Sequence, residues 1–584
     1  MNLNTNIRTM KMTKKAITLG LGLVVIGSAS FAQSLDDAKK AIDAEQYQKA
    51  TSMLKSLVKS QNSKGENYFY LGDVYLKRDY LDSARAAFTQ GVTAEAKNPL
   101  NYVGLGQADL MSNNASSAQT NFAKAIEVAS KKDHIPYLYT GKAYLAIDKP
   151  DFAAALPNLQ KADELDDKDK DPETFLAMGD YNALQRKNSE ALQSYMRALS
   201  INTNLHRSTV QIGRMYKESR AFTEGEQELK NVIAADPNYG PAYRELAELY
   251  RQWADFEPAS AEAKNVEAIT NYKKYLDLTD KSYESRIRYA QILFYAKDYK
   301  SLEQETTELA AMNPNDPKNL IVLRLRGYSA FENQNYPQSL EFMNDFFAKV
   351  KDTARIIPED YLYLGQAQLK NQQDSLGIIN VTKALVRDSS KSVILADLAK
   401  TYYDAKDYKN AMNTYAVANR FNPGGKGSLY NFYYHGAASY YYYGKELNAK
   451  ANPSKDILIQ ADSSFAKLAK LSPSTIDAYL WRGRTNYLLD SDTDPKGPQV
   501  PFYQQYLDSA EAHVDKQTTL MKRYMAEAYN NIAGFSLYKE DKEKAKLYWE
   551  KTLALDPANA IALEGIKSLT PQPKAAPKSA PKKK

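Results

Sequence analysis

A single pattern recurs along most of the chain and limits what it can fold into. Its clearest copy runs from Val393 to Pro423 and reads VILADLAKTYYDAKDYKNAMNTYAVANRFNP. Apolar or small residues recur there at helical spacing on both sides of a polar turn from Ala405 to Asp407. The pattern predicts two short amphipathic helices joined by a tight turn.

The pattern can be followed through fourteen copies, each marked by a small residue after a large apolar one in the first helix. Copies without insertions are 34 residues apart, and the mean period is about 38 residues. One helix pair cannot bury its own apolar face, so the copies are stable only as a stack. The marking residues are Ala38, Gly72, Gly106, Gly141, Gly179, Gly213, Ala247, Ala290, Gly327, Gly365, Ala399, Gly436, Gly483 and Ala533.

The pattern resembles that of the tetratricopeptide repeat (TPR) family over roughly residues 35–569. The resemblance implies an all-α fold, a right-handed superhelical α-solenoid of about fourteen helix-turn-helix repeats. It also implies that partners bind in the concave groove of the array. The residues that carry it are Leu71, Gly72, Tyr75, Ala84 and Phe88 in one copy, and Ile532, Ala533, Ala545, Trp549 and Pro557 in the last.

The two ends of the chain differ from the repeats. Residues 1–32 combine basic residues up to Lys15 with an apolar run from Ala16 to Ile26, which predicts a secretory signal peptide. We expect a periplasmic mature chain that begins near Gln33 and has no transmembrane span. Residues 33–569 form the predicted solenoid, with insertions near 255–265, 443–457 and 490–501, and residues 570–584 form a basic Pro/Ala-rich tail expected to be disordered.

Charge and cysteine content narrow the possible functions. The net charge is +7, but the two terminal segments are basic without any acid, so the solenoid itself is slightly acidic. Nucleic-acid binding needs a basic face on the folded body and is not expected. The lysine-rich tail is able to make a weak electrostatic contact with the envelope. The chain has no cysteine, which excludes disulfides, thiol catalysis and a lipid-modified cysteine.

Two groups of side chains are candidates for partner binding. Projection of the first-helix face onto two adjacent copies gives a basic groove able to hold a carboxylate. The alternative is that Glu218, Glu245 and Glu248 neutralise it. A run of tyrosines on another first helix could stack on a peptide or a sugar, or pack against the neighbouring insertion. The groove comprises Arg207, Arg214, Lys217, Arg244 and Arg251, and the tyrosine stripe comprises Tyr430, Tyr433, Tyr440 and Tyr441.

Catalytic and metal-binding signals are weak. Two DxDxD runs, which begin at Asp167 and Asp490, lack the glycine and glutamate of a calcium-binding loop, so solvated loops are the expectation. The four histidines are isolated in the sequence, and neither HExxH nor GxSxG occurs. We therefore expect no enzyme activity, no cofactor and no metal. The sequence favours a periplasmic scaffold for protein or peptide partners; the alternative is a glycan-binding protein of an outer-membrane uptake system.

Overall fold

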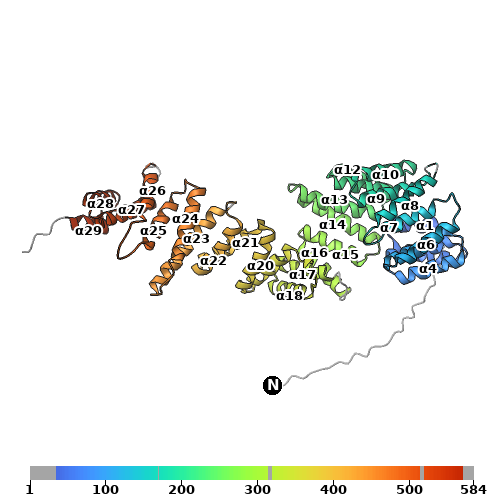
Figure 1. Ribbon diagram of the computed structural model, residues 1–584, viewed down its shortest axis with the longest axis horizontal. Helices are drawn as coiled ribbons and strands as arrows, with labels where there is room; N and C mark the ends of the chain where they lie inside the picture. Colours follow the sequence, from blue (N-terminus) through green and yellow to red (C-terminus); the bar gives the residue numbers. More distant parts are fainter. Residues whose placement is uncertain are drawn as a thin grey trace, which may run out of the picture. The chain divides into compact units, whose positions relative to one another are not determined.

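The computed structural model describes residues 34–166, 168, 170–312, 319–425, 427–512 and 518–569. Within these ranges the chain forms 29 α-helices and two short 3-10 helices, with no strand (Figure 1). The predicted all-α fold is confirmed. The predicted signal peptide and the basic tail lie outside the described residues. The chain divides into two compact units, unit 1 up to Lys297 and unit 2 from Asp298.

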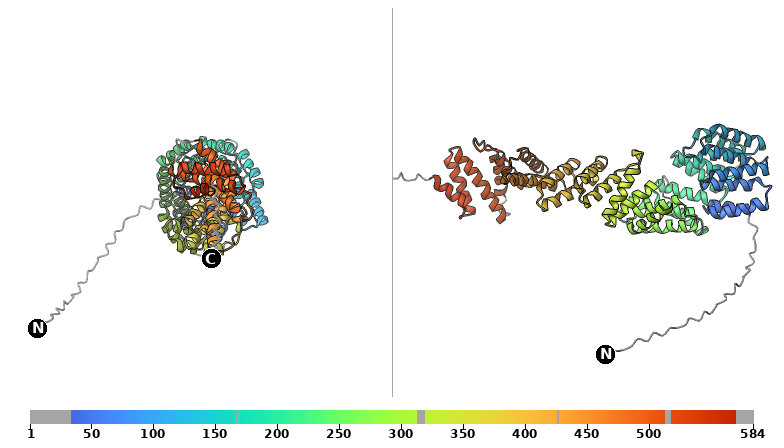
Figure 2. Two further views of the ribbon diagram at one scale, coloured as in Figure 1. Left: turned by 90° about the vertical axis from the view of Figure 1, so that its left-hand side faces the viewer. Right: turned by 90° about the horizontal axis from the view of Figure 1, so that it is seen from below.

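Unit 1 contains seven complete helix pairs and one further helix (Figure 2). Its helices are α1 (Leu35–Asp43), α2 (Tyr47–Ser60), α3 (Gly65–Lys77), α4 (Leu81–Ala94), α5 (Pro99–Met111), α6 (Ala115–Val128), α7 (Ile135–Leu145), α8 (Phe152–Leu165), α9 (Pro172–Leu184), α10 (Asn188–Ile201), α11 (His206–Glu218), α12 (Phe222–Ala235), α13 (Gly240–Phe256), α14 (Ala261–Leu278) and α15 (Tyr283–Tyr295).

Unit 2 begins with a single helix, continues with six pairs and ends with another single helix. Its elements are α16 (Tyr299–Met312), α17 (Asn319–Glu332), α18 (Tyr336–Lys349), η1 (Thr353–Arg355), α19 (Pro358–Lys370), α20 (Asp374–Arg387), η2 (Ser389–Lys391), α21 (Val393–Asp404), α22 (Tyr408–Phe421), α23 (Ser428–Asn448), α24 (Asp456–Leu471), α25 (Asp477–Leu489), α26 (Val500–Glu511), α27 (Thr519–Tyr538), α28 (Lys542–Leu555) and α29 (Ala560–Leu569).

The repeat pattern maps onto these helices without a shift. Each of the fourteen marking residues lies in an odd-numbered helix from α1 to α27, and the even-numbered helix that follows completes the pair. The boundary between the two units falls inside the eighth repeat, between α15 and α16. Of the predicted insertions, the first covers the end of α13, a short loop and the start of α14. The second covers the end of α23, a loop and the start of α24, and the third is the loop between α25 and α26.

Most turns inside the helix pairs end the first helix in the same way. One residue after the C-cap takes a left-handed conformation, as Glu45 does with φ 59°. The next amide, that of Gln46, donates back to the carbonyl of Ala41 at 2.8 Å, which is the hydrogen bond of a Schellman motif. Glycine usually fills this position, but here none of the left-handed residues in these turns is glycine. They include Asp79, Asn113, Arg186, Arg220, Gln334, Gln372, Lys406, Lys450 and Glu540.

No helix in the described part of the chain is both long enough and apolar enough to cross a membrane.

Candidate functional site

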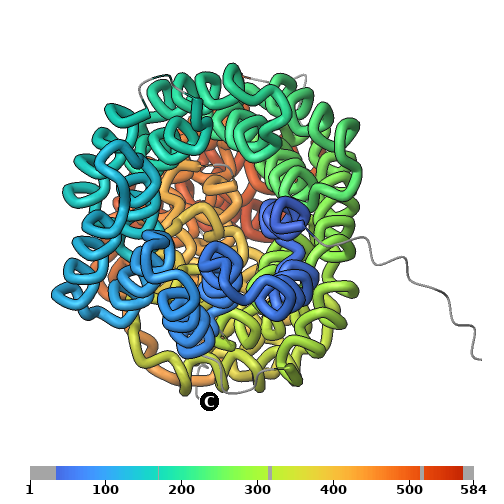
Figure 3. The backbone as a smooth tube through the Cα atoms, turned by 90° about the vertical axis from the view of Figure 1, so that its right-hand side faces the viewer, coloured from blue at the N-terminus to red at the C-terminus, as the bar shows by residue number. Residues whose placement is uncertain are grey.

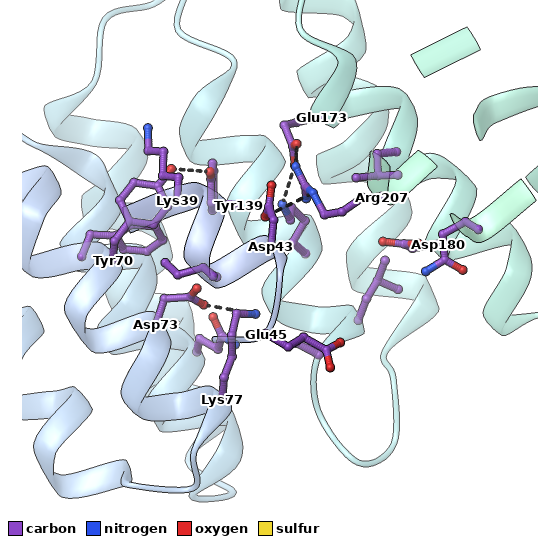
Figure 4. A pocket seen from close by; sticks show the side chains of 18 of the residues that line it. Lys39, Asp43, Glu45, Tyr70, Asp73, Lys77, Tyr139, Glu173, Asp180 and Arg207 are labelled. Atoms are coloured by element: carbon purple, nitrogen blue, oxygen red, sulfur yellow. Dashed lines mark hydrogen bonds and ion pairs between the residues drawn. The ribbon is translucent and has the colours of Figure 1, made fainter. Parts of the chain in front are cut away.

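The first helices of seven consecutive repeats in unit 1 line a common cavity of about 980 Å³. This volume lies at the upper end of the range usual for ligand pockets, ~300–1,000 Å³. Its wall is formed by α1, α3, α5, α7, α9, α11 and α13, and many of its side chains are charged or are tyrosines. Figure 4 shows part of this wall, where the Tyr70 and Tyr139 hydroxyls lie 3.0 Å apart.

Arg207, from the predicted basic groove, lies on the cavity wall (Figure 4). Its guanidinium donates to the Glu173 carboxylate and lies 3.3 Å from an oxygen of Asp43. Lys142 donates to the same Glu173 at 3.0 Å. Burial opposes ionisation of Glu173, but Lys142 and Arg207 outweigh it and lower its pKa to about 2. Arg207 is therefore already neutralised by two carboxylates.

Lys217 and Arg244 share a second carboxylate. The Lys217 ammonium lies 3.2 Å from one oxygen of Glu245, and the Arg244 Nε lies 3.3 Å from the other. Burial would raise the pKa of Glu245, but these two cations, with a smaller contribution from Arg214, lower it to about 2. Arg244 lines the cavity, whereas Lys217 lies outside its wall.

Arg251 also lies outside the cavity wall and is ion-paired. Its guanidinium lies 3.5 Å from Glu248 and 2.8 Å from Asp255. Glu245 and Glu248 thus neutralise the groove in the way that the sequence offered as the alternative. Glu218 is exposed and has no ion pair within the part of the chain that the structure describes.

Arg214 is the exception among the five predicted cations. It lines the cavity, is exposed, and forms no ion pair with any described residue. Gln211 lies about one helical turn earlier on α11 and also lines the cavity. Its side-chain oxygen is buried and accepts no hydrogen bond from the described residues. Together these two side chains offer an incoming group a cation and a hydrogen-bond acceptor.

A contact between the first repeat and the seventh was not predicted. The Glu45 carboxylate, in the turn between α1 and α2, accepts hydrogen bonds from Arg244 at 2.5 and 2.6 Å and from the Tyr275 hydroxyl at 2.8 Å. The Gln48 amide, in the first turn of α2, donates to both oxygens of Asp280 at 2.9 and 3.1 Å. We call this set of contacts the clasp. Figure 3 shows the blue first repeat beside the green helices to which it binds.

The predicted tyrosine stripe lies on α23 in unit 2 and is split between exposed and packed rings. Tyr433 and Tyr440 are partly buried and pack edge-to-face on Trp481 at 6.2 and 5.4 Å. Tyr441 stacks on Tyr408 at 5.3 Å and retains 39% exposure, while Tyr430 is 73% exposed. The four rings therefore do not form one open platform.

Trp481, which the sequence analysis did not single out, organises the aromatic cluster of unit 2. Its ring contacts Tyr433, Tyr440 and Tyr441, and the Arg484 guanidinium lies 4.8 Å from its centroid. Arg484 also pairs with the Glu527 carboxylate at 2.6 and 2.7 Å. The aromatic rings and the arginine of this cluster thus already contact one another and Glu527, as side chains at the packed interface between helices do.

The acidic runs act as caps and loop supports. Asp490 accepts the Lys496 and Gly497 amides, each at 2.9 Å, and Asp171 accepts the Glu173 amide at the start of α9. Asp167 and Asp169 lie outside the described residues. Among the described residues, no group of three or more histidine or acidic side chains is placed to hold a metal ion.

The packing between the two helices of each pair decides the kind of repeat. The glycine of a first helix sits directly against a large ring of the second, so that a Cβ at Gly72 would overlap Phe88. The same holds for Gly179 against Tyr195, and for Gly483 against Tyr503. Small-on-aromatic contacts at this position, repeated with a helix-turn-helix period of 34 residues, are the packing expected of tetratricopeptide repeats. The chain is an α-solenoid of TPR-like helix-turn-helix repeats.

Comparisons with known proteins show several solved structures to which parts of the solenoid are similar. The chain matches the C-terminal part of a TPR repeat-containing protein from Cytophaga hutchinsonii at 27% identity, over 48% of this chain and 99% of that one, with a TM-score of 0.29. It also matches a tetratricopeptide repeat protein from Parabacteroides merdae (18% identity, 45% and 96% of the two chains, TM-score 0.33). A third match is a thermophilic TPR protein of Thermus thermophilus (13% identity, 34% and 99%, TM-score 0.26).

No family model matches the chain, and no curated protein matches it significantly. The structural matches have TM-scores well below 0.5, so they lead to no conclusion about a ligand or a partner. The identification rests on the packing inside the helix pairs.

Proposed function

We propose that this solenoid of TPR-like repeats is a non-catalytic scaffold that binds protein or peptide partners in the bacterial cell envelope. The observation that carries the proposal is the polar cavity of unit 1, on which the first helices of seven repeats converge. Solenoids bind partners on such concave surfaces. Ion pairs fix most of the wall, as at Arg207 and Arg244, so little side-chain entropy is lost when a partner binds.

The absence of catalysis is part of the proposal. Of the histidines that the structure describes, only His435 hydrogen bonds to a hydroxyl, that of Ser464 at 2.6 Å, and both residues are buried in the seam between α23 and α24. A substrate would not reach this pair. His134 is held by Asp171 at 2.9 Å, and His513 lies outside the described residues.

Export to the periplasm is proposed from the composition of residues 1–32, with a mature chain that begins near Gln33. N-terminal sequencing of the protein from a periplasmic fraction tests this directly. A protein that retains Met1, or that fractionates with the cytosol, contradicts it.

Glycan binding receives less support from the geometry. A stacking platform needs exposed ring faces. In the tyrosine stripe, Tyr433 and Tyr440 are packed on Trp481, and Tyr441 is stacked on Tyr408. We therefore retain the protein-binding proposal.

The scaffold is tested by photocrosslinking in cells. A photoreactive residue replaces Arg214 in the cavity, and in a matched control it replaces Thr223, which is exposed on α12 and does not line the cavity. We expect one envelope protein to be captured at position 214 and not at 223, and the purified protein to bind the mature chain. Equal capture at both positions, or turnover of an envelope substrate by the pure chain, contradicts the proposal.

A further inference from the structure

The clasp joins two repeats that are far apart in the sequence. Its polar contacts connect the turn between α1 and α2 to α13, to α14 and to the loop after α14. Asp43 adds a contact to Arg207 on α11. The clasp also has an apolar part, because Ala44 is buried in the same cluster as Tyr239 and Tyr275. The first repeat therefore contacts the seventh through these polar groups and one buried alanine.

This contact changes how the cavity of unit 1 can be entered. In an open solenoid, a segment from the middle of a partner can lie down sideways in the concave groove. In unit 1 the clasp closes the gap between first and seventh repeats, so the wall of first helices runs around the cavity and returns to its start (Figure 3). The cavity nevertheless communicates with solvent, because Arg214 on its wall is exposed.

We propose that unit 1 admits its partner end-first, as an extended, unfolded terminus that enters the closed ring, and that it excludes loops and internal segments of folded proteins. The proposal rests on the scaffold function proposed above. The available side chains suit such a chain: the Arg214 guanidinium pairs with a carboxylate, and the Gln211 side-chain oxygen accepts a backbone amide. Unit 1 would then discriminate among partners first by whether they have a free, unfolded terminus, and only afterwards by the sequence of that terminus.

The chain contains no cysteine, so a single introduced thiol reports on access without background labelling. Arg214→Cys places the thiol on the cavity wall, and Thr223→Cys places it on the open face of α12. Each full-length variant is treated with three reagents. They are N-ethylmaleimide, a flexible Gly/Ser peptide that carries a maleimide at its terminus, and a small folded protein that carries a maleimide directly on its surface.

For each reagent, the rate of thiol labelling in the Arg214→Cys variant is divided by the rate in the Thr223→Cys variant. We expect similar ratios for N-ethylmaleimide and the flexible peptide, and a ratio at least about tenfold lower for the folded protein, which must wait for local opening of the ring. A folded-protein ratio equal to that of the peptide overturns the proposal, because the ring is then open sideways. A peptide ratio as low as that of the folded protein also overturns it, because no chain end is then admitted.

Opening the clasp provides the second arm. Glu45→Gln with Asp280→Asn removes the carboxylates that bind Arg244 and the Gln48 amide. In the Arg214→Cys background, this change should raise the folded-protein ratio towards that of the peptide, with helix content by circular dichroism unchanged. An unchanged ratio in the folded double variant contradicts the role of the clasp. If the double variant does not fold, the three-reagent comparison in the intact ring still decides the question. Neither the labelling comparison nor the clasp variant depends on the crosslinking experiment. The proposal of end-first entry can therefore be refuted while the proposal of a protein-binding scaffold is retained.

Discussion

The carboxylate of Glu45 and the guanidinium of Arg244, 199 positions apart, are joined by two hydrogen bonds of 2.5 and 2.6 Å. Glu45 is itself in the left-handed conformation, with φ 59°, in the turn that follows α1. This one residue therefore ends α1 and also fixes α1 against α13.

Removal of this charge should weaken unit 1. Glu45→Gln leaves Arg244 with Glu245 alone, and we expect the free energy of unfolding to fall by about 1–3 kcal/mol, because the pair is only partly screened by solvent. Urea unfolding measures the change, and faster amide exchange in α1 and α2 locates it. The control is Glu127→Gln, which removes an exposed pair with Lys124 and should leave the free energy of unfolding essentially unchanged. Equal losses in both variants contradict the prediction.

Replacing a glycine by alanine should lower stability where the glycine packs against a ring of the paired helix, and should raise stability where the glycine lies in open space. Gly72→Ala places a methyl group against Phe88 and should destabilise unit 1 by about 1–3 kcal/mol through overpacking. At Gly444 in α23 nothing lies within 4 Å of the added methyl group, so Gly444→Ala should stabilise unit 2 by about 0.5–1 kcal/mol. Thermal unfolding of the two variants checks both signs.

The turn residues predict a further stabilisation. Gln334 is exposed with φ 64° in the turn between α17 and α18, a conformation that costs a side-chain-bearing residue about 1 kcal/mol. Gln334→Gly should recover up to about that amount in urea unfolding. Glu341→Gly, at an exposed position inside α18, is the matched control and should cost about 1 kcal/mol. A loss of stability in both variants is the result that contradicts this explanation.

His435 should make unit 2 sensitive to acid. Burial, with a smaller contribution from Lys467, lowers the pKa of His435 to about 4, whereas an unfolded histidine titrates near ~6.5. Between these values the unfolded chain binds a proton that the folded chain does not. Stability should therefore fall by roughly 3 kcal/mol as the pH drops from about 6.5 to about 4, and no further below that. Urea unfolding of wild type and His435→Gln across this range should differ in slope; identical slopes refute the assignment.

Arg214 should contribute to partner affinity. Arg214→Glu reverses the one predicted groove cation that has no ion pair among the described residues, and it should weaken binding of the captured partner by about tenfold or more. Arg251→Gln changes a cation that lies outside the cavity and should leave binding within about twofold. Calorimetric titration with the purified partner measures both. Equal weakening by the two variants would indicate that net charge matters rather than the cavity.

The sequence predicted the helix pairs well because each depends on contacts within one period. The spacing of Gly72 and Phe88, for example, lies within one repeat. The clasp was not predictable in this way. Whether Glu45 meets Arg244 depends on small rotations accumulated over six repeats, and no single period records them.

The same limit explains the candidate site. Helical spacing put Arg207 and Arg244 on the correct face. Their partners are Asp43, at the end of α1, and Glu45, in the turn after it, and only ring closure brings these two residues near. For the tyrosine stripe, spacing identified one face of α23. It did not show that Trp481, on the next first helix, would cover Tyr433 and Tyr440.

The clasp also changes how the terminal repeat of unit 1 couples to the rest of the solenoid during unfolding. In a linear solenoid each repeat couples to its nearest neighbours, so a terminal repeat has one neighbour, frays first and requires a cap. At the C-terminal end, α29 serves this purpose by packing Gly565 on Trp549. The first repeat has a second neighbour instead, because the clasp also ties it to the seventh repeat. The N-terminal end of unit 1 should accordingly fray less once α13 and α14 have been synthesised, because only then can the first repeat form the clasp.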